Sequence, residues 1–189
     1  MTTPIETYWH GTEYHDCDRL GIVIQRSNEA IHARCVVVHL LTKEENGGNH
    51  NLYMDVIDEN NNRLNNSLLR GRNNNINLST RIDKPPNEFG CNFAMYPQDT
   101  ISCWVGEVPG LGKIPSDVVS GFSTRWGGPI VGNQDYGHIS YYVIWQIATT
   151  PGEPPVEPPI DDCTQLAKDY VALQNKYNKL LTGIRELAK

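Results

Sequence analysis

The sequence predicts a mainly β fold, an antiparallel β-sandwich, which is followed by a proline-rich linker and a C-terminal coiled-coil helix. Two observations define its parts. Short runs of alternating apolar and polar residues recur up to residue 150, and after residue 161 apolar residues recur at steps of three and four. Alternation is the period of a half-buried strand, and steps of three and four are that of a coiled coil. We therefore expect a β-domain at 1–150, with an N-terminal arm at about 1–19, a linker at 151–160 and a helix at 161–189.

Eight segments of the β-domain are predicted to be strands. In chain order they are 20–25, 31–41, 51–58, 75–82, 93–95, 100–105, 118–122 and 139–147. They are rich in β-branched or aromatic residues and are bounded by Gly, Pro, Asn or Asp. In the last of them, Tyr141, Val143 and Trp145 share one face. Because no helical pattern intervenes, the segments predict two packed antiparallel sheets. A small barrel fits the same periodicity.

Asparagine is concentrated between the predicted strands, at 12 of the 32 residues from 46 to 77. Asn tolerates left-handed backbone and bonds its own turn, so these clusters predict tight turns and polar loops. Residues 58–64 fit a hairpin connection. Asp58, Asn60 and Asn62 alternate as in a calcium loop, but the sixth position is Arg63 rather than Gly and the twelfth is Leu rather than Glu. The segment therefore predicts a turn rather than a metal site.

The linker and the segment after it differ in kind from the β-domain. The linker begins PGEPPVEPP, which favours polyproline II, a stiff spacer of about 3.1 Å per residue. An unbroken heptad seam follows, with Cys163, Tyr170, Tyr177 and Ile184 at its a positions and Leu166, Leu173, Leu180 and Leu187 at its d positions. A seam this narrow predicts a homo-oligomer, and its bulky a positions favour a trimer over a dimer. The alternative is that the helix packs on its own sandwich.

The composition argues against several classes of protein. A net charge of -6 and a pI near 5.5 argue against nucleic-acid binding, which needs a basic face. No stretch approaches the roughly 20 apolar residues that span a bilayer. The first residues lack the pattern of a signal peptide. Five cysteines cannot close an intrachain disulfide framework, so reduced thiols are expected in a protein made in the cytoplasm.

No catalytic or cofactor motif is present. Residues 106–114 look like a phosphate loop, but the motif needs a glycine six residues before Lys113, and residue 107 is Glu. They also have Ile114 where Ser or Thr must reach magnesium. His10, His15 and Cys17 lie close together and, with Cys35, are weighed as zinc ligands. Their spacing matches no established zinc site, so ordinary structural roles are favoured. We therefore expect a non-enzymatic protein without a metal or a cofactor.

Aromatic residues in loops give a positive signal. Trp126 lies in the segment STRWGGP, whose glycines and proline leave the ring little to pack against, and Tyr8 and Trp9 precede the first predicted strand. Exposed aromatic rings beside polar groups such as Arg125 stack on sugar rings. Tyr8, Trp9, Arg125 and Trp126 are therefore candidate glycan contacts. The alternative is that these tryptophans cap the sandwich or contact another protein.

Four segments resemble stretches of immunoglobulin-like, carbohydrate-binding-module-like sandwich domains. They are GNHNLYMDVIDE (48–59), DKPPNE (83–88), PSDVVSG (115–121) and GHISYYV (137–143). Such domains occur in bacteriophage genomes and attached to bacterial glycan-active enzymes. The resemblance covers roughly residues 35–147 and carries over no catalytic residue. It implies an immunoglobulin-like or jelly-roll-like sandwich.

The resemblance also implies a function. We expect a structural protein of a bacteriophage virion, such as a head decoration, cement or fibre-like protein, which is assembled in the host cytoplasm. Its expected partners are further copies of itself, other virion proteins such as the major capsid protein, and a cell-surface glycan. The alternatives are a free carbohydrate-binding or adhesion module that a coiled coil oligomerises, and an accessory subunit of a bacterial glycan-active complex.

Overall fold

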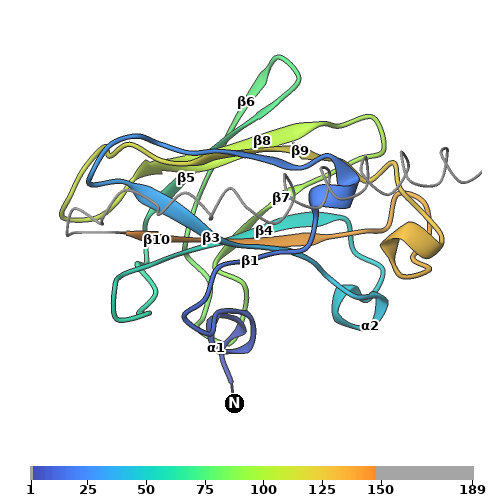
Figure 1. Ribbon diagram of the computed structural model, residues 1–189, viewed down its shortest axis with the longest axis horizontal. Helices are drawn as coiled ribbons and strands as arrows, with labels where there is room; N and C mark the ends of the chain where they lie inside the picture. Colours follow the sequence, from blue (N-terminus) through green and yellow to red (C-terminus); the bar gives the residue numbers. More distant parts are fainter. Residues whose placement is uncertain (1, 148–189) are drawn as a thin grey trace, which may run out of the picture. The chain divides into compact units, whose positions relative to one another are not determined.

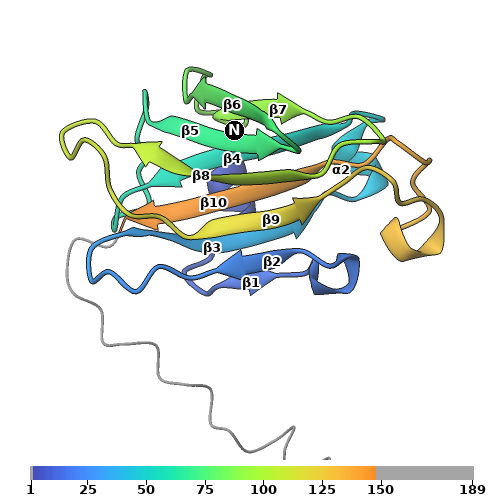
Figure 2. The same ribbon diagram turned by 90° about the horizontal axis from the view of Figure 1, so that it is seen from above.

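The computed structural model describes residues 2–147. These residues form two five-stranded β-sheets that pack face to face (Figure 1). In spatial order, one sheet consists of β1 (Tyr14–His15), β3 (Ala33–Leu40), β10 (Tyr141–Ile147), β4 (Asn51–Ile57) and β7 (Cys91–Ala94). The other consists of β2 (Val23–Gln25), β9 (Val118–Phe122), β8 (Ile101–Glu107), β5 (Leu68–Asn73) and β6 (Ile76–Arg81). We name them the β10 sheet and the β8 sheet after their middle strands, and Figure 2 shows their strands running in similar directions.

The β-sandwich that the sequence predicts is confirmed, and the barrel alternative is wrong, because the described strands form two separate sheets. All eight predicted strands are present with slightly shifted ends, whereas β1 and β5 were not predicted. Four short helical segments were not predicted either: α1 (Pro4–Tyr8), η1 (Asp18–Leu20), α2 (Lys43–Asn46) and η2 (Pro129–Val131). The predicted linker at 151–160, the predicted helix at 161–189 and its seam from Cys163 to Leu187 lie outside the described residues.

The purely antiparallel arrangement that the sequence predicts is wrong for the β10 sheet. β10 pairs antiparallel with β3 but parallel with β4, so that Tyr141 lies opposite both Leu40 and Leu52. β1 also pairs parallel with β3. The reason is topological: β3 and β4 run in opposite directions, and a strand inserted between them must be parallel to one of them. The β8 sheet is antiparallel throughout.

β10 is buried on both faces, although its sequence predicts only one apolar face. Tyr141, Val143 and Trp145 lie in the core between the sheets, as predicted. Tyr142 and Ile144 lie on the opposite face, in a second apolar cluster that includes residues of the N-terminal segment. That segment carries α1, where Thr3 and Glu6 form a reciprocal capping box and Pro4 occupies the first helical turn. The N-terminal segment therefore covers the outer face of the β10 sheet (Figure 1).

The turn predicted after the third strand is confirmed and is closed by an antiparallel bridge between Ile57 and Arg63, but it does not join two strands of one sheet. The Asp58 carboxylate accepts hydrogen bonds from the backbone N–H groups of Asn60 and Asn62, both at 2.8 Å. Asn61 has a left-handed backbone, with φ of 65°. However, β4 belongs to the β10 sheet and β5 to the β8 sheet, so the connection crosses between the layers.

A buried ion pair stabilises this crossing. The carboxylate of Asp55 on β4 is fully buried, and it lies 2.6 Å from Nε of Arg63 and 3.0 Å from its Nη2. The Tyr142 hydroxyl (2.8 Å) and the Gly90 N–H (3.0 Å) also donate to it. Burial raises the pKa of Asp55, and the charge of Arg63 opposes that rise. Arg63 additionally donates to the carbonyls of 84, 85 and 88, so it holds the loop before β7 in place.

Arg63→Met should destabilise the domain by about 3–5 kcal/mol, because it leaves the Asp55 carboxylate buried without its counter-charge. Urea denaturation followed by circular dichroism would measure the change. The matched control is Arg81→Met, whose ion pair with Glu107 lies at the surface and should contribute less than about 1 kcal/mol. Equal unfolding midpoints for the two variants would contradict the role given to Arg63.

Candidate functional site

The topology of the β10 sheet brings several loops to one end of the sandwich. β4 begins at Asn51, β7 ends at Ala94 and β10 begins at Tyr141. β10 is parallel to β4, and β7 is antiparallel to β4. The residues just before β4, just before β10 and just after β7 therefore lie at the same end of the sheet. These residues are His50, 95–97 and 136–138. The end lies at the right in Figure 1, beside α2.

The long loop between β9 and β10 is held on this end by hydrogen bonds to the sandwich. The Tyr141 hydroxyl donates to the Ser123 carbonyl (2.8 Å), and the Gly137 N–H donates to the Thr124 carbonyl (2.9 Å). The buried Gln134 side chain donates to the Leu41 carbonyl (2.8 Å) and accepts from Asn46 of α2 (2.9 Å). Hydrogen bonds of buried side chains therefore hold the loop in place.

Glycine allows two parts of this loop to approach closely. A β-carbon on Gly127 would lie 3.1 Å from the backbone nitrogen of Tyr136, and one on Gly137 would lie 3.2 Å from the Pro97 ring. Gly137 also has a φ of 80°, which side chains rarely adopt. As a result, the segment containing Trp126 runs beside Tyr136, and Tyr136 is held close to the loop after β7.

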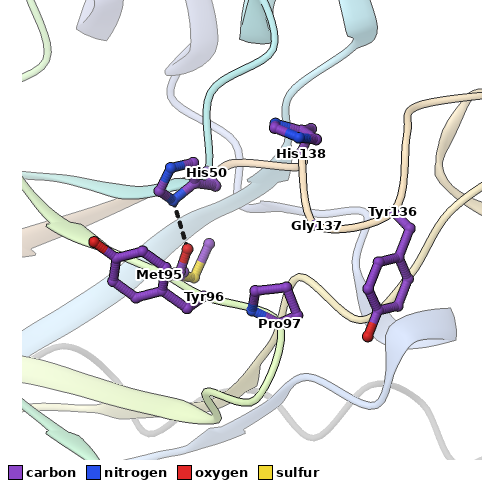
Figure 3. A pocket seen from close by; sticks show the side chains of 7 residues that line it. All are labelled: His50, Met95, Tyr96, Pro97, Tyr136, Gly137 and His138. Atoms are coloured by element: carbon purple, nitrogen blue, oxygen red, sulfur yellow. Dashed lines mark hydrogen bonds between the residues drawn. The ribbon is translucent and has the colours of Figure 1, made fainter.

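The three segments enclose an open pocket of about 190 Å³ (Figure 3). Its lining residues are His50, Met95, Tyr96, Pro97, Tyr136, Gly137 and His138. In Figure 3, Pro97 lies between the rings of Tyr96 and Tyr136, and the two imidazoles lie along the opposite border. Tyr96 is 53% exposed and Tyr136 is 62% exposed, so both rings present apolar area to solvent. We call this set, together with Trp126, the aromatic end.

Both histidines of the aromatic end are bonded to backbone carbonyls through the same nitrogen. Nδ1 of His50 lies 2.5 Å from the Met95 carbonyl oxygen, and Nδ1 of His138 lies 3.0 Å from that of Gly48. A carbonyl can only accept, so Nδ1 carries the hydrogen in each ring. In a neutral imidazole the other nitrogen, Nε2, is then an acceptor. The two rings lie edge to face with their centroids 6.3 Å apart.

Two of the predicted glycan contacts lie near this pocket and two do not. Arg125 and Trp126 follow β9, and the Trp126 side chain is 37% exposed. Nε of Arg125 donates to the Ser123 hydroxyl at 3.2 Å. Trp9, by contrast, is only 8% exposed, and its Nε1 donates to Asn61 at 2.6 Å. A ring buried to this extent offers no face to a sugar, and Trp9 packs in the apolar cluster on the outer face of the β10 sheet.

Tyr8 packs inside an aromatic and charged cluster on the outer face of the β10 sheet. Its ring lies 4.9 Å from that of His39 and 5.2 Å from that of Tyr142, centroid to centroid. His39 lies between two carboxylates, with Nδ1 2.8 Å from Asp16 and Nε2 3.3 Å from Glu45. The structure therefore separates Tyr8 and Trp9 from the loop that carries Arg125 and Trp126.

The cysteines among the possible zinc ligands have separate surroundings. Cys17 contacts Asp16 and the Val38 carbonyl, whereas Cys35 lies beside the Val37 carbonyl. Among the side chains that the structure describes, which are those of residues 2–17 and 19–147, no group of three or more His, Cys, Asp and Glu has an arrangement that could hold a metal ion. None of the helices in the same range has the length and apolar character that crossing a membrane requires.

The carboxylates around His39 shift its titration. Burial alone would lower the pKa of His39, but the hydrogen bond and charge of Asp16, followed by those of Glu45, raise it above its usual value. For Asp16 and Glu45, burial alone would raise the pKa. The hydrogen bond of His39 to Asp16 and that of the Thr42 N–H to Glu45 are the largest opposing effects, and the pKa of each carboxyl is lowered.

The stability of the domain should therefore fall on the alkaline side of neutrality. The contribution of His39 is complete below about pH 6.5, the usual value for unfolded His, and is lost as the pH rises through its higher folded pKa. Asp16 and Glu45 also stabilise the domain, but their contributions depend on pH in the opposite direction. They are complete above about pH 4.5 and are lost as the pH falls through the lowered folded pKa values. Unfolding free energies at pH 6 to 9 should show a wild-type advantage over His39→Gln that shrinks with rising pH. The control His10→Gln, at an exposed histidine, should leave the profile unchanged, and a constant advantage would contradict this assignment.

The comparisons with known proteins transfer no function to the aromatic end. No protein-family model, no curated protein and no solved structure matches this chain. A ligand for the aromatic end can therefore be inferred only from the chemistry of the described side chains: exposed ring faces, two imidazole acceptors and the two tyrosine hydroxyls that border the pocket.

Proposed function

We propose that the protein is a non-enzymatic structural protein of a bacteriophage particle. It displays the β-sandwich on the particle surface as a head decoration, cement or fibre-like protein, and its C-terminal helix joins several copies or attaches them to a neighbouring component such as the major capsid protein. The resemblance of residues 35–147 to sandwich domains of phage genomes supports this proposal.

The observation that carries the proposal is how the fold uses its buried ionisable groups. Asp55 and Asp117 are fully buried, and both are bonded to donors of the same domain. Burial raises the pKa values of the Cys35, Cys91 and Cys103 thiols, which therefore stay protonated and unreactive at neutral pH. The two carboxylates join separate segments of the domain, and none of these five residues lines the pocket.

The oligomer follows from the heptad seam in the C-terminal segment. In a helical segment its eight a and d residues would form one narrow apolar stripe, which helices bury by winding around one another. Three chains accommodate the tyrosines at the a positions better than two. Copies joined in this way would present several aromatic ends at once, which raises the avidity for a repetitive surface.

The native mass measured by light scattering should be about three times the 21.3 kDa chain mass. Leu173→Glu combined with Leu180→Glu should reduce it to that of a single chain, because both side chains belong to the d positions of the seam. Asn175→Glu is the matched control, since residue 175 is at the outward f position and its variant should keep the oligomer. A wild-type mass equal to one chain would contradict the proposed assembly.

A free carbohydrate-binding or adhesion module is the second candidate, and the exposure of Trp126 beside Arg125 favours it. Two measurements on the same full chain separate the candidates. Co-sedimentation with particles of the phage that encodes the chain, whether or not a glycan array gives a signal, is the result expected for the structural role. Glycan binding that Trp126→Ala abolishes, without particle association, would favour the free module. If the wild-type chain neither associates with particles nor binds a glycan, both candidates are contradicted.

A further inference from the structure

We infer that the pocket between Tyr96 and Tyr136 binds one ring of a neutral carbohydrate. The inference rests on the carbohydrate-binding candidate above and gives it a site: His50, Tyr96, Tyr136 and His138, none of which the sequence indicated. These residues come from three separate segments, and only the order of the strands brings them together.

The two tyrosines provide the apolar part of the site. Both are more than half exposed, and they border the same pocket on either side of Pro97 (Figure 3). Exposed aromatic side chains normally cost free energy because they order water, so two of them beside one pocket indicate a ligand that covers them. The C–H face of a sugar ring covers an aromatic ring without removing its own hydroxyls from water.

The two histidines provide the polar part. Each donates Nδ1–H to a backbone carbonyl, which fixes the ring and leaves Nε2 as an acceptor. Among the hydrogen bonds of residues 2–147, neither these Nε2 atoms nor the hydroxyls of Tyr96 and Tyr136 have a protein partner. Nε2 of each histidine and the hydroxyls of Tyr96 and Tyr136 therefore remain for a ligand: the imidazole nitrogens accept from the hydroxyl donors of a sugar, and the tyrosine hydroxyls both donate and accept.

The charge and size of the pocket narrow the ligand class. None of its lining side chains is a carboxylate, an ammonium or a guanidinium, so it has no group to neutralise a phosphate, a sulfate or a charged peptide. Its volume of about 190 Å³ is smaller than the roughly 300–1,000 Å³ of most small-molecule sites, which suits one ring rather than an oligosaccharide. A longer glycan would extend from the pocket toward Trp126, whose segment runs beside Tyr136.

A metal ion is the main competing occupant, because a histidine that binds a metal through one nitrogen usually donates its other ring N–H to a carbonyl or a carboxylate. The pocket supplies only two such nitrogens. No third His, Cys, Asp or Glu lines it, and no metal-holding group occurs elsewhere in the described part of the chain. The open pocket and its tyrosines therefore fit a sugar better.

The test is saturation-transfer NMR of the full chain with a panel of free neutral monosaccharides, followed by titration of those that bind. One or more should bind in the millimolar range, as expected for so small a ligand. Tyr136→Ala and Tyr96→Ala should each weaken binding by about tenfold, since each removes a stacking face. His138→Phe should weaken it similarly, and His138→Gln should restore part of the loss because it keeps a hydrogen-bonding group. Leu111→Ala, at an exposed apolar residue in the loop between β8 and β9, is the control and should bind as wild type does.

Several results would overturn the inference. They are no binding of any neutral monosaccharide, binding that EDTA abolishes and zinc restores, and binding that survives both tyrosine substitutions. Binding lost in Trp126→Ala but retained in both tyrosine variants would keep the carbohydrate-binding candidate and reject this pocket as its site. Unchanged melting temperatures would show that each variant is folded.

Discussion

The carboxylate of Asp117 is the constraint on which the rest of the sandwich depends. It lies immediately before β9 of the β8 sheet, yet it accepts the N–H of Cys35 in β3 of the β10 sheet at 2.9 Å. The Ser27 N–H (2.8 Å) and Nη1 of Arg26 (2.8 Å) also donate to this carboxylate. Nε1 of Trp145 donates to the backbone carbonyl of Asp117 (3.1 Å). A buried charge is tolerated only with such a set of donors. One side chain therefore fixes the separation of the two layers and the path of the loop that joins β2 to β3.

Much of the β-domain could be predicted because its strands alternate, but the exceptions have physical causes. β5 has the sequence LLRGRN, and its alternation is lost at Gly71. A β-carbon at Gly71 would lie 2.8 Å from the ring of Phe93 in the other sheet and 2.9 Å from the Ser102 carbonyl, so glycine is required where the layers approach closely. The place of β10 between β3 and β4 was equally hidden, because pairing order depends on contacts between distant residues rather than on local pattern.

The aromatic end illustrates the same limit for a site. Trp126 could be identified because glycines and a proline surround it, and the structure places it at the surface. Tyr96 and Tyr136 carry a similar local signal, since Pro97 and Gly137 follow them directly. What no local signal contains is their proximity to His50 and to each other, which follows from the parallel pairing of β10 with β4. Trp9 gave a false indication because the capped α1 turns its ring onto the sheet.

The central position of β10 has a consequence for the biosynthesis of the domain. β3 and β4 do not pair with each other. They are held in one sheet only because each pairs with the strand β10, which is the last described strand. While the ribosome synthesises the chain, β1 with β3 and β4 with β7 can form only as separate pairs, each with one edge unpaired and apolar. The domain can close only after Ile147 has left the exit tunnel, so its folding is delayed until translation of the domain is finished. Until then the exposed edges of β3 and β4 are where a nascent-chain chaperone would be needed most.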